Sequence, residues 1–401
     1  MRGKSVVPVL ILVLSLILGS PMLNAASLQV LYTFIGADGG APDSGVILGP
    51  DGALYGVTAF GGDYDNGTVF RLSQAQGGVW SETVLYSFSG LRSPSGGLTF
   101  DDEGNLYGTT YYGGYYDCGD IFKLTPDGSS WTFSVIHEFQ GWELWDGCHP
   151  EANLRYDQGS GLVFGTTVNG GHSLYPGEGT AFSFGKNPVY DYAVYPMQGK
   201  NGYEPLGSVN EWGYGTTWAG GKYQVGNIFK LGQAGKQVKM KRLFRPNRLG
   251  YNPSGELLTQ NLNGARAMYG TGYGGGTGGH GVVYQLRENP NKPDAWSMHV
   301  LYSFSGTDGD GPYEGLAMDG AGNLYGTTSM GGTEPAYAGT VFKLTPDQSG
   351  KWRQTLLYSF TGGADGTSPR GTLALDSAGN LYGTAISGGA FGWGVVFQIV
   401  P

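Results

Sequence analysis

Charged residues are scarce in this sequence, and recognisable cofactor motifs are missing. Only 14% of the 401 residues are charged, and an acidic excess gives a net charge of −9. Because a nucleic-acid partner requires a basic face, this balance argues against binding of DNA or RNA. The sequence has no phosphate-binding P-loop and no zinc-type spacing of Cys and His. We therefore expect no cofactor and no bound metal.

Long apolar runs are confined to the N-terminus. Arg2 and Lys4 precede an apolar stretch over residues 6–18, and the small residues 25–26 follow it. This stretch is short for a bilayer span and typical of a signal peptide, with an uncleaved anchor as the alternative. We predict that residues 1–26 are an export signal and that no membrane span remains after its removal. The protein would then be secreted, periplasmic or on the cell surface.

Glycine, in contrast, is abundant, and its 75 residues recur at fixed places among strand-forming residues. A short apolar segment that ends in an aromatic residue and glycine occurs seven times, about 55 residues apart. Its aromatic residues are Tyr55, Tyr107, Phe164, Tyr214, Tyr269, Tyr325 and Tyr382. A second segment also occurs seven times, with the aromatic residues Phe70, Phe122, Phe182, Phe229, Tyr284, Phe342 and Phe397.

Each repeat can be divided into four short strands, as its second copy shows. The expected strands cover residues 97–100, 106–110, 121–124 and 131–139, with turn sequences rich in Asp, Gly and Pro between most of them. Four strands per repeat and seven repeats predict an all-β fold. We expect residues 27–401 to form a seven-bladed β-propeller with four antiparallel strands per blade, with an open solenoid as the alternative.

The phase of the repeat predicts how this propeller closes. Residues 28–34 match a fourth strand with no unit before it, and residues 395–399 match the third strand of the last unit. We expect the N-terminal strand to pair with that third strand and complete the last blade. The ring would then be closed without an exposed edge at its seam.

The repeat also resembles a known one. Its second copy reads Gly-Leu-Thr-Phe at 97–100, Gly-Asn-Leu-Tyr-Gly-Thr-Thr at 104–110 and Gly-Asp-Ile-Phe-Lys-Leu-Thr-Pro at 119–126. This run is similar to the GloVer-type tandem repeat of exported bacterial proteins. The likeness is close in units two, six and seven, fair in unit one, and loose in units three to five. It implies an exported propeller-repeat protein and no particular activity.

The sequence contains two cysteines, Cys118 and Cys148. The first falls in the loop between the second and third strands of blade two, and the second in the connection from blade two to blade three. Both loops belong to the same face of the predicted propeller, at the same blade junction. In an oxidising compartment this placement predicts a Cys118–Cys148 disulfide, with two free thiols as the alternative.

Function is expected where the units differ, in the long variable loops of one face. The loop over 141–151 is the most unusual, and loops of blades three and four add further large side chains. The candidate ligand-binding residues are Trp142, Trp145, His149, Glu151, His172, Glu178 and Trp218. Flat aromatic rings beside carboxylates suit stacking on sugars and hydrogen bonding to hydroxyls. Local packing of these side chains is the alternative.

Three functions fit this pattern. The first is an extracellular module that binds a polysaccharide or cell-surface glycan. The second is a glycan-active enzyme, a hydrolase or lyase, whose catalytic carboxylates the sequence does not identify. The third is a structural or adhesive surface protein. Asp-Gly pairs such as those in 308–311 are typical of turns rather than of calcium sites, and we expect a monomer.

Overall fold

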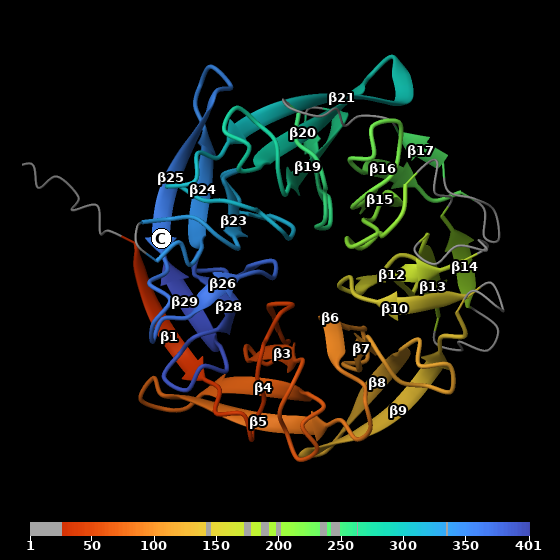
Figure 1. The fold of residues 1–401 in the computed structure, drawn as a ribbon, viewed down its shortest axis with the longest axis vertical. Helices are drawn as coiled ribbons and strands as arrows, with labels where there is room; N and C mark the ends of the chain where they lie inside the picture. The colour runs from red at the N-terminus through yellow and green to blue at the C-terminus, as the bar shows by residue number, and fades with distance from the viewer. Residues whose placement is uncertain are drawn as a thin grey trace, which may run out of the picture.

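The structure, a computed structural model, describes residues 26–141, 146–171, 178–185, 192–197, 202–232, 239–241, 249–262, 264–333 and 336–401. The predicted signal sequence lies outside these residues except for Ala26, and stays a prediction. The described residues form strands and no helix, and Figure 1 shows the sheets arranged around a common axis. The predicted all-β propeller arrangement is therefore confirmed. No helix in this part of the chain is long and apolar enough to cross a membrane.

Each of the first three units forms one antiparallel sheet. The first contains β2 (Val46–Leu48), β3 (Leu54–Thr58), β4 (Thr68–Gln74) and β5 (Trp80–Ser87). The second contains β6 (Pro94–Phe100), β7 (Leu106–Thr110), β8 (Asp120–Asp127) and β9 (Ser130–Glu138). The third contains β10 (Gly147–Pro150) and β11 (Arg155–Asp157), both paired with β12 (Leu162–Gly170), followed by β13 (Thr180–Phe184) and β14 (Ala193–Pro196).

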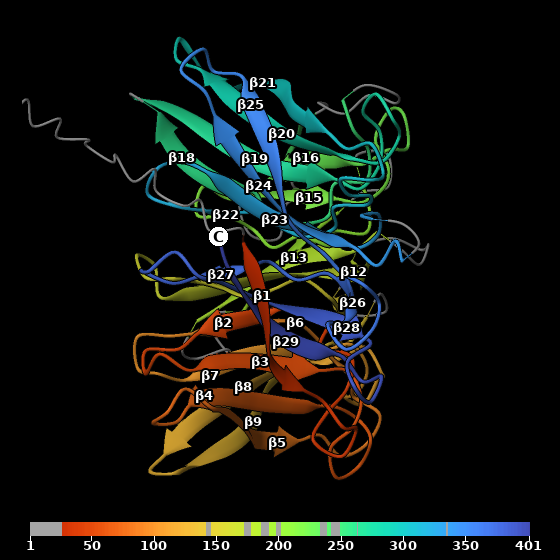
Figure 2. The same ribbon diagram turned by 90° about the vertical axis from the view of Figure 1, so that its left-hand side faces the viewer.

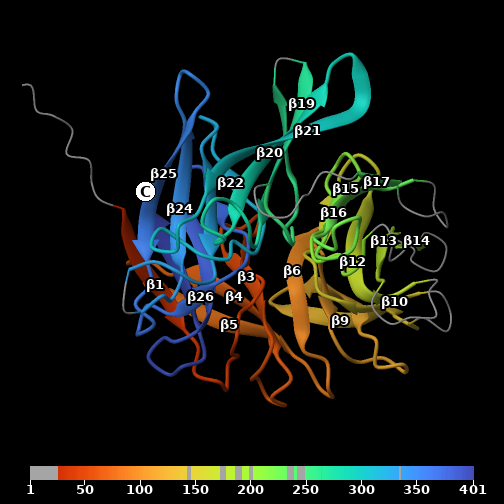
Figure 3. The same ribbon diagram turned by 45° about the horizontal axis from the view of Figure 1, so that its top comes forward.

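The remaining four sheets continue around the axis. The fourth contains β15 (Tyr214–Thr217), β16 (Asn227–Lys230) and β17 (Lys239–Lys241). The fifth contains β18 (Leu258–Leu262), β19 (Ala265–Gly272), β20 (Val282–Asn289) and β21 (Lys292–Ser303), and its hairpin β20–β21 lies at the periphery of the molecule (Figure 3). The sixth contains β22 (Ala317–Met318), β23 (Leu324–Thr328), β24 (Thr340–Pro346) and β25 (Trp352–Ser359). The last contains β26 (Thr367–Pro369), β27 (Ala374–Leu375), β28 (Leu381–Ser387), β29 (Val395–Val400) and the N-terminal β1 (Ser27–Thr33).

Six of these sheets are blades of four or five strands, whereas the sheet of β15–β17 has three. The prediction of seven four-stranded blades is therefore wrong, because only six of the described sheets have at least four strands. In the fourth unit the innermost segment runs only from Pro205 to Asn210, whose amide donates to the carbonyl of Tyr214 (2.8 Å) and closes a turn. Because this segment reaches its turn so soon after it begins, it forms no ladder with β15.

The N-terminal strand pairs with the last strand of the chain. β1 is antiparallel to β29, with Leu28 opposite Ile399 and Thr33 opposite Val395. This pairing confirms the partner that the phase of the repeat predicted for the first strand. It adds one strand to the sheet of β28 and β29, whose edge would otherwise be unpaired.

The recurring aromatic–glycine pair has a packing cause. In blade one, a Cβ atom added to Gly56 of β3 would lie 2.5 Å from the ring of Phe70 in β4, which is fully buried. The glycine therefore makes room for the aromatic ring of the neighbouring strand. The same relation joins Gly108 to Phe122 in blade two. The two sevenfold patterns of the sequence thus describe one contact that recurs inside the sheets.

The two faces of the propeller differ in the length of their loops. Seen edge-on in Figure 2, the loops between second and third strands lie on one side and the short hairpin turns between first and second strands on the other. The first side is named the long-loop face, and the second the short-turn face. The innermost segment of each unit enters the centre of the molecule from the long-loop face.

A charged and aromatic network joins the three-stranded sheet to blade five. The guanidinium of Arg266 in β19 lies between the rings of Trp212 (5.3 Å) and Trp296 (5.5 Å). It also forms an ion pair with Glu288 of β20 (2.5 Å). Because Trp212 precedes β15, this contact ties the incomplete sheet to a complete neighbour.

Candidate functional site

A proline opens the innermost segment of every repeat unit. These prolines are Pro42, Pro94, Pro150, Pro205, Pro253, Pro312 and Pro369. The residue before each proline has a positive φ, for example 52° at Ala41 and 58° at His149. This left-handed conformation is strained for residues other than glycine, and such strain concentrates at functional sites. The backbone thus enters the centre of the molecule in the same way in each unit.

The side chain after the proline, in contrast, differs from unit to unit. The seven residues are Asp43, Ser95, Glu151, Leu206, Ser254, Tyr313 and Arg370. Four of them, Asp43, Ser95, Glu151 and Tyr313, line a cavity of about 40 Å³ together with Glu314. A cavity of this size holds one or a few water molecules. A larger ligand would therefore rest over the cavity and place a single group inside it.

Three carboxyl groups share this cavity, and one guanidinium forms an ion pair with the first of them, Asp43. The Nη1 atom of Arg370 lies 3.7 Å from Oδ1 of Asp43. Burial and the negative charges of Asp43 and Glu151 raise the pKa of Glu314 to about 8, against the opposing charge of Arg370. Burial and the charge of Asp43 likewise raise the pKa of Glu151 to about 7. At neutral pH the cluster therefore retains protons and can both donate and accept hydrogen bonds.

An aromatic wall stands beside the carboxyl cluster. The guanidinium carbon of Arg370 lies 5.0 Å from the centre of the Tyr313 ring. The Tyr313 ring centre is 5.8 Å from that of Trp218 and 6.1 Å from that of Tyr273. All three rings are half-buried, so part of each remains accessible from the surface. Such rings offer flat apolar contact area next to polar groups.

A second aromatic group lies near Glu151. The imidazole of His149 stacks on the ring of Tyr111 at 4.5 Å, with the two planes 8° apart, and its Nδ1 accepts a hydrogen bond from Asn169 (3.0 Å). Burial lowers the pKa of His149. Burial, and then the charge of Glu151, raise the pKa of Tyr111, and the same charge acts on Tyr313. Glu151 is thus within electrostatic reach of both aromatic groups.

The predicted disulfide holds this part of the site in place. Cys118 and Cys148 are bonded, with their Cα atoms 4.4 Å apart, which confirms the prediction. The bond joins the loop between β7 and β8 to β10. The amide of His149 also donates to the carbonyl of Cys118 (2.8 Å). The chain is therefore fixed immediately before Pro150 and Glu151.

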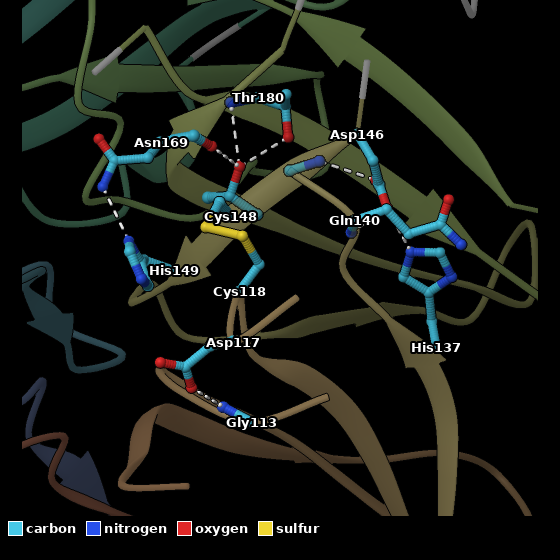
Figure 4. The surroundings of a disulfide bond; sticks show 12 residues. Gly113, Asp117, Cys118, His137, Gln140, Asp146, Cys148, His149, Asn169 and Thr180 are labelled. Carbon is cyan, nitrogen blue, oxygen red and sulfur yellow. Dashed lines mark hydrogen bonds and ion pairs between the residues drawn. A yellow bond between two sulfur atoms is a disulfide. The ribbon is translucent and has the colours of Figure 1, made fainter. Parts of the chain in front are cut away.

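The buried carboxylate of Asp146 lies near the disulfide and holds the chain before Cys148 in place through several hydrogen bonds (Figure 4). Asp146 accepts a hydrogen bond from the hydroxyl of Tyr192 (2.6 Å) and from the amide of Gly147 (2.7 Å), and pairs with Nε2 of His137 (2.8 Å). Burial alone would raise the pKa of Asp146, but the bonds with His137, Tyr192 and Gly147 lower it. Asp146 lies nine residues after His137, between β9 and β10, so this pair joins the end of β9 to the start of β10.

The structure brings three of the seven candidate residues to the centre of the long-loop face. Glu151 lines the cavity, and His149 and Trp218 belong to the two aromatic groups beside it. Glu178 lies in the loop before β13. Trp142, Trp145 and His172 lie outside the described residues.

Sequence reasoning missed Asp43, Tyr313, Glu314 and Arg370. The signal that could have found three of them is the repeated proline, because the residue after it varies between units while the proline does not. Variation beside a constant framework is the pattern expected of a binding site on a repeat scaffold. Glu314 lies one residue further along the chain, where most units have glycine or alanine.

A larger cavity, of about 410 Å³, opens toward the short-turn face. Its walls combine Val, Ile and Leu side chains of the innermost strands with polar and charged residues such as Asn153, Arg155 and Glu256. Two of its polar groups are already bonded, since Asn153 accepts the amide of Gly97 (2.5 Å) and the Nε of Arg155 donates to the carbonyl of Val209 (2.6 Å). Burial raises the pKa of Glu256 in this cavity to about 7. The cavity at the long-loop face is smaller but brings more charged and aromatic groups together.

The Asp-Gly pairs of the blade junctions form turns. Asp308 accepts hydrogen bonds from the amide of Ser305 (2.8 Å) and from the hydroxyl of Tyr302. Asp38 and Asp365 make equivalent bonds in the first and last junctions. Among the described residues, no group of three or more His, Cys, Asp or Glu could hold a metal ion.

The repeat that builds this site is a known one. The Gloeobacter/Verrucomicrobia repeat matches residues 22–213 and 291–401, which together make up most of the chain. The chain belongs to the Gloeobacter/Verrucomicrobia repeat family. The unmatched stretch of this repeat protein includes the three-stranded sheet and most of blade five. No curated protein matches the sequence.

Several solved structures are similar to this repeat protein at low sequence identity. A copper-bound fungal alcohol oxidase matches at a TM-score of 0.53 with 13% identity, over 94% of this chain and 76% of the oxidase. The periplasmic gluconolactonase of Pseudomonas aeruginosa matches at 0.48 with 13% identity, over 80% and 85% of the two chains. A protein of unknown function from Dyadobacter fermentans matches at 0.48 with 11% identity, over 94% and 98%. At this identity the likeness concerns the fold alone.

Proposed function

We propose that this protein is exported and binds a polysaccharide or cell-surface glycan at the centre of its long-loop face. One sugar unit would lie over the cavity lined by Asp43, Glu151 and Glu314. One of its hydroxyl or hydroxymethyl groups would enter the cavity, and its ring would contact the wall of Tyr313 and Trp218. The N-terminal sequence pattern and the disulfide support an extracellular or periplasmic location.

The observation that carries this proposal is the arrangement of carboxyls beside half-buried aromatic rings. Sugars present hydroxyl groups that both donate and accept, and Glu151 and Glu314 match them because their raised pKa values leave protons on the cluster at neutral pH. Sugars also present flat apolar ring faces, which aromatic side chains can cover. The small cavity excludes a deeply buried ligand and favours one that lies on the face.

The proposal includes a closed ring of seven repeat units around this site. Two contacts support closure at the seam. β1 pairs with β29, and a Cβ atom added to Gly394 of the last unit would lie 2.6 Å from Cδ of Pro42 in the first. The same glycine–proline contact joins the first unit to the second, from Gly67 to Pro94 (2.5 Å). The seam is therefore packed in the same manner as an ordinary junction.

A second candidate function is glycan cleavage at the same place. Its support is the raised pKa of Glu314, because a carboxyl that stays protonated at neutral pH is suited to general-acid catalysis. Asp43 and Glu151 would be the carboxylates available as its partner. A product assay on any bound glycan separates this function from binding alone.

A glycan array probed with the purified mature protein tests the proposal. We expect binding to at least one polysaccharide, and we expect Trp218→Ala to weaken it while leaving the melting temperature within a few degrees of the wild type. Tyr115→Ala provides the matched control, because Tyr115 is 87% exposed on the same face but belongs to blade two. An equal loss of glycan binding in the two variants would contradict the proposal, and so would a wild-type protein that binds no glycan.

A further inference from the structure

The long-loop face carries a second aromatic surface outside the central cavity. Most large hydrophobic side chains that are exposed among the described residues lie in the loops of this face, and most of those are aromatic. Two of them, Trp393 and Phe60, lie at the seam between the last unit and the first. Trp393 is 40% exposed and Phe60 is 52% exposed. They are named the seam platform.

The backbone holds the indole of Trp393 flat. A Cβ atom added to Gly40 would lie 2.5 Å from Cε3 of Trp393, and one added to Gly36 would lie 3.0 Å from its Cε2. The ring therefore lies across both glycines, and no other residue would permit so close an approach at Gly40. The amide of Ala41 also donates to the carbonyl of Trp393 (2.9 Å). An indole packed on backbone at one side and exposed at the other is a preorganised contact surface.

The main chain of Phe60 is joined to the same strip of backbone. Gly40 and Phe60 form an antiparallel bridge, in which the amide of each donates to the carbonyl of the other (2.9 and 3.1 Å). Gly40 thus lies under Trp393 and is bonded to Phe60. Both aromatic residues are held by main-chain bonds rather than by side-chain packing alone.

A short stretch of chain joins the seam platform to the cavity lined by Asp43. The chain runs from Gly40 through Ala41 and Pro42 to Asp43, which lines the cavity. Three residues span roughly 10 Å at most. A chain of a few linked sugar units that lies over Asp43 would therefore reach the platform if it left the cavity in this direction.

We propose that the seam platform binds further sugar rings of a neutral polysaccharide whose other units occupy the central cavity. This inference rests on the proposed function and names its ligand class. A polymer is inferred because a single sugar over the cavity would leave the platform empty. A neutral polymer is inferred because the protein carries a net charge of −9, which repels anionic chains.

Binding of short and long saccharides by the folded mature protein tests this inference. The probes are the disaccharides and hexasaccharides of a neutral β-glucan, a xylan and a mannan, with alginate as the anionic comparison, each titrated calorimetrically. For at least one neutral series we expect the hexasaccharide to bind about tenfold more tightly than the disaccharide. Trp393→Ala should remove this difference and leave disaccharide binding unchanged, and Trp393→Phe should restore part of it.

Tyr223→Ala is the matched control, because Tyr223 is 43% exposed on the same face but belongs to the fourth unit. It should retain the preference for the longer saccharide. A preference that survives Trp393→Ala, with disaccharide binding intact, would overturn the seam platform and leave the proposed function standing. Tighter binding of alginate would overturn the neutral ligand class. Failure of the wild type to bind any of these saccharides would overturn both proposals.

Discussion

Glu314 is a half-buried carboxyl that destabilises the folded protein when it ionises. Its pKa is raised from 4.5 to about 8, first by burial and then by the charges of Asp43 and Glu151. Between these two pH values the unfolded chain releases the proton while the folded chain keeps it, so the free energy of unfolding falls as pH rises. Below pH 4.5 both states are protonated, and above about pH 8 both are ionised and the loss is complete.

The size of this loss in the free energy of unfolding follows from the rise in the pKa of Glu314. A change from 4.5 to about 8 corresponds to at most about 5 kcal/mol, since each pH unit is worth 1.36 kcal/mol. Because the side chain is only half-buried and water screens it, we expect about 2 kcal/mol. The Glu314→Gln variant has no carboxyl that can ionise at this position. Its free energy of unfolding should therefore exceed that of the wild type by about 2 kcal/mol at pH 8.5 and equal it at pH 4.5.

Urea denaturation of both proteins at pH 4.5, 6.5 and 8.5 measures this difference. Glu138→Gln is the control, because Glu138 is an exposed acid of β9 on the outside of blade two. It should follow the pH dependence of the wild type. If Glu314→Gln and the wild type have parallel stability profiles over this range, Glu314 is not held in a shielded acidic cluster and the reasoning fails.

Three further predictions concern the scaffold. Replacing Cys118 and Cys148 by Ser should lower the free energy of unfolding by about 3 kcal/mol, because the bond closes a loop of 30 residues; urea denaturation measures it, and an unchanged midpoint would contradict it. Arg266→Met should lower the free energy of unfolding by roughly 1–3 kcal/mol, because the contact between the three-stranded sheet and blade five is lost. The melting temperature should fall with it, and an unchanged melting temperature would show that the contact is dispensable. Gly56→Ala should cost about 1–3 kcal/mol because its Cβ would meet an aromatic ring, whereas Gly320→Ala, where nothing lies within 4 Å, should cost much less; equal losses would argue against the packing account.

Much of the fold could be predicted from the sequence because the repeat encodes local contacts. Gly56 and its equivalents recur with the aromatic ring that each accommodates, so the period of the pattern is the period of the structure. The pairing of β1 with β29 and the Cys118–Cys148 bond followed from the phase of that period. The strand missing from the fourth sheet did not follow, because it depends on how few residues separate Pro205 from the turn at Asn210.

The candidate site was only partly predictable. Glu151, His149 and Trp218 stand out as unusual residues of long loops, and the structure places them around one cavity. Asp43 and Arg370 belong to units far apart in sequence, and their ion pair exists only because the ends of the chain meet at the seam. Sequence spacing alone does not reveal which side chains converge at the centre of the propeller.

A crystal structure of the protein with a bound oligosaccharide tests the central claim most directly. We expect one sugar ring over the cavity, in contact with Tyr313 and Trp218, and one of its hydroxyl groups within hydrogen-bonding distance of Glu151 or Glu314. A sugar bound instead in the 410 Å³ cavity of the short-turn face, or on the outer strands of the blades, would contradict the assignment of the site to the long-loop face.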